Sequence, residues 1–258
     1  MENFFTIVLT IFGGLIGSFL NAVIHRVPRN ISIVSPRSCC PKCKKLIYWY
    51  ENIPILSYLF LRGKCSKCHE SISIRYPIIE ALCALVAFFL VPKDISLQNL
   101  TFFLFYFSIF ATLLAQLLID IEHQLLPNSL NLFLLIPIIP FVLLTKSWEH
   151  WLFGGLAGFG FPFLITWGFY VLRGKVGLGG GDIKLYGVLG LLLGLKGIFL
   201  NIFLSCFLGS IVGVGMIILF KLDKSKPIPF GPFIIIVASF QIYFPQLFKS
   251  FVGQILNL

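Results

Sequence analysis

Two aspartates stand beside long apolar runs, where a charged side chain is costly. Asp120 ends the apolar run 102–119, and Asp182 follows three glycines and precedes another apolar run. An ionisable group at the edge of a membrane segment is a functional hypothesis by default, because it is expensive to keep there. Two carboxyl groups close together cannot both ionise easily, so one stays protonated. Such a pair can hydrolyse a peptide: the carboxylate takes a proton from water while the acid protonates the substrate carbonyl. We therefore expect Asp120 and Asp182 to be catalytic.

The alternative is that the two aspartates have purely structural roles. Asp182 could pair with Lys184, and Asp120 could cap a helix. Glu122 and His123 could be the titrating groups instead of Asp120, although they lie further past the apolar run. Both aspartates at one membrane face would favour chemistry over these alternatives.

The block that carries Asp182 suits the approach of a substrate backbone. Gly179, Gly180 and Gly181 permit backbone conformations closed to other residues and let another chain come near. We expect these glycines and Lys184 to form the substrate loop. A phosphate-binding loop is the rival, but the block lacks the Gly-Lys-Ser/Thr ending and a preceding strand.

Four cysteines form two C-x-x-C pairs in one polar stretch. They are Cys40, Cys43, Cys65 and Cys68. Pairs with this spacing predict a structural zinc site, and cytosolic thiols stay reduced, which favours metal over a disulfide. The alternatives are a redox or disulfide pair and cysteines without a function. Cys39 and His69 are alternative ligands, and the x-x spacing favours Cys40 over Cys39.

The composition is that of a membrane protein. Hydrophobic residues make up 58% of the 258 residues and charged residues only 12%, whereas soluble domains have about 25% charged residues. We predict an all-α polytopic membrane protein with about eight transmembrane helices and a small cysteine-rich, cytoplasmic, zinc-binding insert. The predicted spans are 4–24, 77–92, 100–120, 128–145, 152–172, 183–195, 197–220 and 229–248. Glycine pairs four residues apart, such as Gly13 and Gly17, predict close helix packing.

The basic residues predict the orientation. With the insert in the cytoplasm, only Lys93, Lys146, Lys196 and Lys249 of the 20 Lys and Arg residues fall outside, which leaves 16 inside. Both termini then lie outside, and both aspartates lie at the cytoplasmic face. The net charge of +10 is explained by this bias, and no nucleic-acid motif accompanies it, so we expect no nucleic-acid partner. The predicted domains are 1–25 (first span), 26–76 (cytoplasmic zinc module) and 77–258 (helical core with the two aspartates).

Several motifs together resemble the bacterial type IV prepilin peptidases over nearly the whole chain. The resemblance rests on 17–28 (GSFLNAVIHRVP), both C-x-x-C pairs, 52–58 (NIPILSY), 61–65 (LRGKC), 72–80 (ISIRYPIIE), Asp120 with 126–128 (LPN), and 179–184 (GGGDIK).

The resemblance implies an aspartic endopeptidase of the G-x-G-D type in the bacterial inner membrane, with Asp120 and Asp182 catalytic. It implies cleavage of short basic leaders after glycine from type IV prepilin or pseudopilin precursors, on the cytoplasmic side, among membrane lipid. Members with the cysteine insert are similar to enzymes that also methylate the new N-terminus with S-adenosylmethionine. Where the family often has Leu-Pro-Asp, this chain has Asn128, so a carboxylate is missing near the first aspartate.

Two other classes of function are compatible with parts of the pattern. In a transporter or channel, the aspartates would be ion ligands or proton relays. In a membrane-anchored zinc module, the insert would bind a partner and the aspartates would be dispensable.

Overall fold

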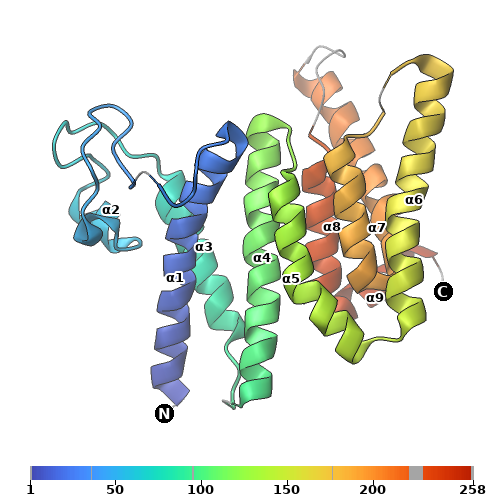
Figure 1. The fold of residues 1–258 in the computed structure, drawn as a ribbon, viewed down its shortest axis with the longest axis horizontal. Coiled ribbons are helices and arrows are strands. Elements are labelled where there is room, and N and C mark those ends of the chain that lie inside the picture. The colour runs from blue at the N-terminus through green and yellow to red at the C-terminus, as the bar shows by residue number, and fades with distance from the viewer. Residues whose placement is uncertain (1, 36, 95, 176, 221–228, 257–258) are drawn as a thin grey trace. The chain divides into compact units, whose positions relative to one another are not determined.

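A computed structural model describes residues 2–35, 37–94, 96–175, 177–220 and 229–256 (Figure 1). Regular structure in these ranges is helical, with two isolated β-bridges in the insert. The helices are α1 (Glu2–Arg26), η1 (Val27–Arg29), η2 (Trp49–Asn52), α2 (Leu56–Phe60), α3 (Arg75–Leu90), α4 (Leu97–His123), α5 (Asn128–Thr145), α6 (Trp148–Arg173), α7 (Gly180–Phe220), α8 (Gly231–Tyr243) and α9 (Pro245–Leu256). The expected all-α polytopic class is confirmed.

The expected number of eight spans is not confirmed. Within the described ranges, five helices are long and apolar enough to cross a membrane, or six if α8 and α9, which meet at 111°, form one broken span. Helix α3 has only 16 residues and is not among the five. Helix α7 is counted as one of the five, although it contains two helices. Three lysines that we expected inside, Lys221, Lys224 and Lys226, lie outside the described residues.

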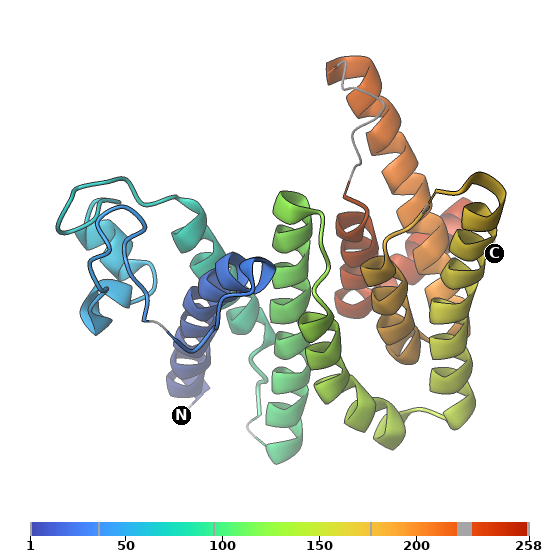
Figure 2. The same cartoon turned by 45° about the horizontal axis from the view of Figure 1, so that its top comes forward.

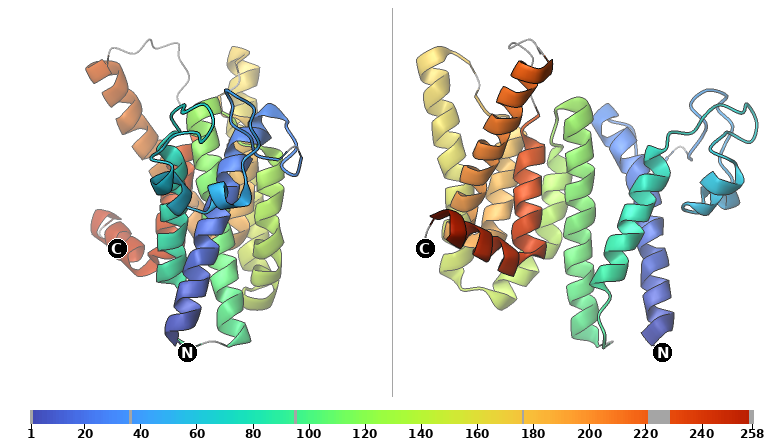
Figure 3. Two further views of the ribbon diagram at one scale, coloured as in Figure 1. Left: turned by 90° about the vertical axis from the view of Figure 1, so that its left-hand side faces the viewer. Right: turned by 180° about the vertical axis from the view of Figure 1, so that it is seen from behind.

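The chain divides into two compact units, Met1–Ala115 and Gln116–Leu258. In the first unit, α3 packs along α1 (Figure 3). A Cβ atom at Gly13 would lie 2.5 Å from Cβ of Ala87, and one at Gly17 would lie 2.7 Å from Cα of Glu80. The two glycines thus let α3 approach closely, as their spacing predicts.

In the second unit, α7 folds back on itself. Gly194 has φ 70° and ψ 178°, which breaks the helix. Residues 19 apart in a straight helix are about 28 Å apart, yet Oη of Tyr186 lies 2.6 Å from Oγ of Ser205. The two halves therefore run side by side, as Figure 2 shows. The sequence predicts two spans here with a border at Lys196, and the break lies at Gly194.

The first half of α7 also packs tightly against α6. A Cβ atom at Gly154 would lie 2.2 Å from the carbonyl oxygen of Gly190, and one at Gly158 would lie 2.3 Å from that of Tyr186. On the second half, the buried Asn201 donates to Gln241 of α8 at 2.9 Å. These contacts hold α7 against α6 and α8, and the candidate site lies where α7 and α8 begin.

Candidate active site

Asp120 lies in the last turn of α4 and is only 5% exposed. Its carbonyl oxygen accepts a hydrogen bond from the backbone N–H of Gln124 at 2.8 Å, which closes the helix. Gln124 itself has φ 52°, and Pro127 follows, so the chain cannot continue as a helix. The end of α4 therefore places Asp120 where the chain turns toward α5.

Asp182 lies in the first turn of α7 and is partly buried. The carbonyl oxygen of Gly179 accepts from the N–H of Ile183 at 3.3 Å, so the glycine block forms the entry to the helix. A Cβ atom at Gly179 would lie 2.8 Å from Oδ2 of Asp182. The missing side chain leaves room for the carboxyl group beside its own loop.

Two further glycines bring the two aspartates to one place. A Cβ atom at Gly181 would lie 2.8 Å from Cβ of Leu126, in the turn after α4. A Cβ atom at Gly231, the first residue of α8, would lie 2.7 Å from Oδ2 of Asp120. Three elements thus meet around the carboxyl groups: the end of α4, the start of α7 and the start of α8.

Each carboxyl group keeps one oxygen available. Oδ2 of Asp120 and Oδ1 of Asp182 are buried and have no hydrogen-bond partner among the described residues. Leu126 lies beside both Gly181, which precedes Asp182, and Gly231, which lies against Asp120. Two adjacent carboxyl groups that share one proton can activate a water molecule and protonate a carbonyl oxygen.

A buried polar relay connects α4 to the Asp182 block. Nε2 of Gln116 donates to Oδ1 of Asn131 at 2.7 Å, and Nδ2 of Asn131 reaches the carbonyl oxygen of Gly181 at 3.5 Å. Sequence reasoning missed Gln116, Asn131 and Gly231. The signal for Gln116 was present, since Ser108, Thr112, Gln116 and Asp120 recur every four residues in an apolar run.

Lys184 of the expected substrate loop lies beside a cleft rather than against Asp182. Its Nζ donates to Oδ1 of Asn128 at 2.9 Å. Both residues line a cleft of about 530 Å³ between α5, α6 and α7. Asn131 of the relay lines the same cleft, which connects this space to the Asp182 block.

Glu122 and His123, the alternatives to Asp120, lie at the surface. Glu122 and His123 are exposed, and their charged atoms lie 3.9 Å apart. A pair of groups that shares one proton needs burial, which Asp120 has and these two exposed side chains lack.

In the first unit, the four cysteines of the two C-x-x-C pairs form one cluster. Their sulfur atoms all lie within 4.8 Å of one another, with 3.8 Å between Cys40 and Cys68 and 3.9 Å between Cys43 and Cys65. Four sulfurs about 2.3 Å from a central zinc ion would be about 3.8 Å apart in a tetrahedron. Cys39 and His69 are not members of this cluster. The four-cysteine cluster can therefore hold a metal ion.

Each C-x-x-C pair lies in a turn, residues 40–45 and 65–70, and these two Cys turns have the same hydrogen bonds. Each first cysteine donates its N–H to a residue five positions on, Cys40 to Lys45 and Cys65 to Glu70, and accepts from the residue four positions on. Lys44 and His69 both have positive φ, near 55°, where each turn reverses. This repetition directs both thiols of each turn to a common point.

Backbone N–H groups, burial and neighbouring thiols shift the pKa values of three of the four cysteines. The N–H groups of Cys68 and Lys67 lower the pKa of Cys65 to about 6, and those of Cys43 and Lys42 lower the pKa of Cys40. Although the Glu70 peptide opposes it, burial and the neighbouring thiols raise the pKa of Cys68 to about 11. A cation among the four sulfurs would favour the thiolate form of each cysteine.

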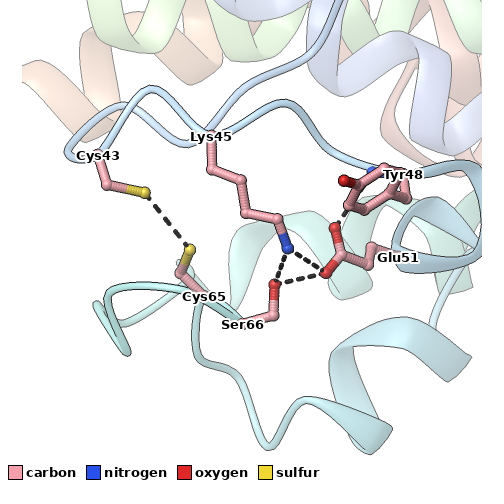
Figure 4. Close-up of polar contacts among 6 residues, drawn as sticks. All are labelled: Cys43, Lys45, Tyr48, Glu51, Cys65 and Ser66. Carbon is pink, nitrogen blue, oxygen red and sulfur yellow. Dashed lines mark hydrogen bonds and ion pairs between the residues drawn. The ribbon is translucent and has the colours of Figure 1, made fainter.

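A polar network ties the two Cys turns to η2 (Figure 4). Nζ of Lys45, after the first turn, donates to Oε1 of Glu51 at 2.7 Å and to Oγ of Ser66, in the second turn, at 2.5 Å. Ser66 also donates to Glu51, and Oε2 of Glu51 accepts from the N–H of Tyr48 at 3.1 Å. The Glu51 side chain is 9% exposed, and its carboxylate is the centre of this network.

Both halves of the chain match known protein families. Residues 11–93 match the Bacterial Peptidase A24 N-terminal domain, and residues 105–214 match the Type IV leader peptidase family. The Prepilin leader peptidase/N-methyltransferase of Aeromonas hydrophila is 38% identical over 256 residues, covering 88% of this chain and 86% of that protein.

Relatives from other bacteria carry the same name. That of Bacillus subtilis (strain 168) is 37% identical over 233 residues, covering 87% of this chain and 88% of its own. That of Pseudomonas aeruginosa is 35% identical over 262 residues, covering 90% and 88%. No solved structure was found to match the chain. On these matches the chain belongs to the type IV leader peptidase family.

Proposed function

We propose that the protein is a membrane aspartic endopeptidase that removes the leader from type IV prepilin or pseudopilin precursors, with Asp120 and Asp182 as the catalytic pair. The observation that carries the proposal is the convergence of α4, α7 and α8 on two carboxyl groups, each with a buried oxygen that has no partner among the described residues. The matching family and the names of the relatives support the substrate class.

In the proposed reaction, one carboxylate takes a proton from a water molecule, which attacks the scissile carbonyl carbon. The other, protonated carboxyl group gives its proton to the carbonyl oxygen. The C–N bond then breaks as a proton reaches the leaving amine. No covalent intermediate forms on the protein. The Gln116–Asn131 relay would hold the Asp182 block in place during these steps, since it ends on the Gly181 carbonyl.

Gly179, Gly180 and Gly181 would form the surface on which the peptide lies, with Lys184 at its edge. Gly180 offers a clean test, because a Cβ atom there meets nothing within 4 Å in the protein. A higher KM for Gly180→Ala at unchanged stability would report contact with substrate. An unchanged KM would remove Gly180 from the substrate surface.

The same names imply a second activity, methylation of the new N-terminus with S-adenosylmethionine. In the proposed division of the chain, residues 1–25 are the first span, 26–76 the zinc module and 77–258 the peptidase core. The zinc module and both aspartates lie on the cytoplasmic face of the inner membrane.

The metal proposed for the cluster is zinc, because four thiols with tetrahedral spacing suit it and the ion would supply a small module with folding energy. Metal analysis of the purified protein should give about one zinc per chain, and Cys40→Ser and Cys65→Ser should each lower it. Unchanged zinc in both variants would discard this ligand set.

The function is tested by incubating detergent-purified protein with a prepilin-type precursor and reading the products by mass spectrometry. We expect cleavage after the leader glycine, and one added methyl group on the mature N-terminus when S-adenosylmethionine is present. A folded protein that cleaves none of several precursors would overturn the proposal. Cleavage without methylation would limit it to the peptidase.

A further inference from the structure

The segment of the insert that contains η2 and α2 is anchored well below the end of α1. Pro54 packs against Gly14, where a Cβ atom would lie 3.5 Å from Cβ of Pro54. Gly14 lies within the membrane-capable helix 4–29, and it is 12 residues before Arg26, which is about 18 Å along a helix. The chain between the two Cys turns therefore returns to the level of the membrane span.

A second anchor fixes the same segment to α3. The backbone N–H of Ile55 donates to Oε2 of Glu80 at 2.7 Å, and Glu80 is 8% exposed. Leu56 donates to the carbonyl oxygen of Pro54, so Ile55 is the centre of a γ-turn with φ 63°. A β-branched residue adopts this conformation only when its surroundings impose it. Helix α2 starts directly after this turn, and Figures 1 and 3 show it at the height of the upper turns of α3.

The side chains around these anchors are aromatic and aliphatic, and they are exposed. Trp49 is 76% exposed, Leu59 64% and Phe60 83%. Tyr48 and Tyr50 are stacked, with ring centroids 5.5 Å apart, and are also exposed. A water-facing surface would rarely gather so many large apolar groups. Trp and Tyr are the residues that favour the membrane–water boundary.

The charge of the insert matches an anionic membrane surface. Residues 26–76 contain Arg26, Arg29, Arg37, Lys42, Lys44, Lys45, Arg62, Lys64, Lys67 and Arg75 against only Glu51 and Glu70. Basic groups near an anionic bilayer add binding free energy to that of buried apolar groups.

We propose that Trp49, Tyr50 and helix α2 insert into the membrane, at the boundary between lipid headgroups and acyl chains. The occupant of this apolar surface is the bilayer that α1 crosses. The Cys turns then stand above a segment that is held by Pro54 on α1 and by Glu80 on α3. One segment of the insert is thus embedded in the membrane surface, while the Cys turns face water.

The fluorescence of single tryptophans in lipid nanodiscs tests this proposal. Trp148, Trp151 and Trp167 are replaced by Phe, which leaves Trp49. A second variant adds Trp49→Phe and Phe60→Trp to report on α2. The matched control carries Trp49→Phe with Lys67→Trp, at an exposed residue of the second Cys turn.

We expect Trp49 and the tryptophan at position 60 to be quenched by phosphatidylcholine brominated on its acyl chains, more strongly by bromines near the headgroup. Acrylamide should quench them several-fold less than the control. Equal quenching by acrylamide at all three positions would overturn the proposal. Protection from acrylamide without quenching by brominated lipid would also overturn it, because a protein surface would then cover the segment.

Folding of each variant is checked by its metal content and by the circular dichroism of its helices. If a substitution unfolds the protein, hydroxyl-radical footprinting of the unmodified chain gives the same information. Trp49, Tyr50 and Phe60 should be oxidised several-fold less in nanodiscs than expected from their exposure in the protein alone. Oxidation at the rate of free aromatic residues would contradict membrane insertion.

Discussion

Asp120 and Asp182 could be selected from the sequence because a carboxylate next to an apolar run has a high energetic cost. Their partners could not be selected in the same way. Gly231 approaches Asp120 only because α8 packs against the second half of α7, through contacts such as Asn201 with Gln241. Gln116 was within reach of sequence reasoning, since it lies one helical turn before Asp120. Asn131 gave no such signal, because it lies at the start of an apolar helix beside Asn128.

A single methyl group at Gly231 should damage the site. In Gly231→Ala, the new Cβ would lie 2.7 Å from Oδ2 of Asp120, so the carboxyl group or α8 must move. Displacement of a catalytic group by about 1 Å can cost about 100-fold in rate. We expect a loss of that order in kcat for leader cleavage, measured by gel or mass spectrometry. Gly215→Ala, where a Cβ meets nothing within 4 Å, is the control and should keep its rate. Equal rates for the two variants would show that Gly231 does not confine Asp120.

At the scale of elements, apolar runs and glycines predicted most of the helices. The sequence also indicates that residues 183–220 form two spans. Gly194 makes the turn because only glycine adopts the combination of φ 70° and ψ 178° without strain. The last span was predicted to end at residue 248, but α8 ends at Tyr243 and α9 turns away by 111°. Pro245 begins α9, and hydrophobicity alone gives no signal for a change in helix direction.

The close contact between α6 and α7 at Gly154 should be sensitive to one added methyl group. In Gly154→Ala, the Cβ would lie 2.2 Å from the Gly190 carbonyl oxygen, so the helices must separate. Overpacking of this kind costs about 1–3 kcal/mol of the free energy of unfolding. Thermal unfolding in detergent should show the loss. Gly160→Ala, on the same helix and with nothing within 4 Å, is the matched control and should unfold like the wild type. Identical unfolding of both variants would argue against close packing of α6 on α7 at Gly154.

The Cys turns depend on Glu51 more than on Glu70. Glu51 joins both turns through Lys45 and Ser66 and is largely buried, whereas Glu70 pairs with Lys42 at the surface, where ion pairs add little. Glu51→Gln should therefore release zinc to a chelator several-fold faster at pH 7, as followed by a colorimetric zinc indicator. Glu70→Gln should release it at nearly the wild-type rate. Faster release from Glu70→Gln than from Glu51→Gln would reverse this assignment.

At the scale of the whole molecule, composition and charge were enough to predict a polytopic membrane protein of helices. The expected number of eight spans is not confirmed, because α3 has only 16 residues and α7 is counted once although its two halves run side by side. The two C-x-x-C pairs were predicted to form one site, and the four sulfurs do lie together. The position of η2 and α2 beside α1 had no sequence signal, since it depends on Pro54 and Glu80 from distant parts of the chain.

The excess of basic residues in the insert predicts its side of the membrane. We expect epitope tags at both termini to be removed by protease added to intact spheroplasts. A tag placed within the insert, after Ser35, should be protected until the membrane is broken. Removal of the insert tag from intact spheroplasts would show the opposite orientation and would place Asp120 and Asp182 on the outer face.

The central claim is that Asp120 and Asp182 act together as the catalytic pair. Leader cleavage by wild type, Asp120→Asn and Asp182→Asn should be compared in parallel, with Glu122→Gln as the control, since Glu122 is an exposed carboxylate beside the site. General acid–base groups contribute about 10²–10⁴-fold, so we predict that each aspartate variant loses at least about 100-fold in kcat while keeping its zinc and its unfolding temperature. Glu122→Gln should cleave like the wild type. A wild-type rate in either aspartate variant would contradict the account.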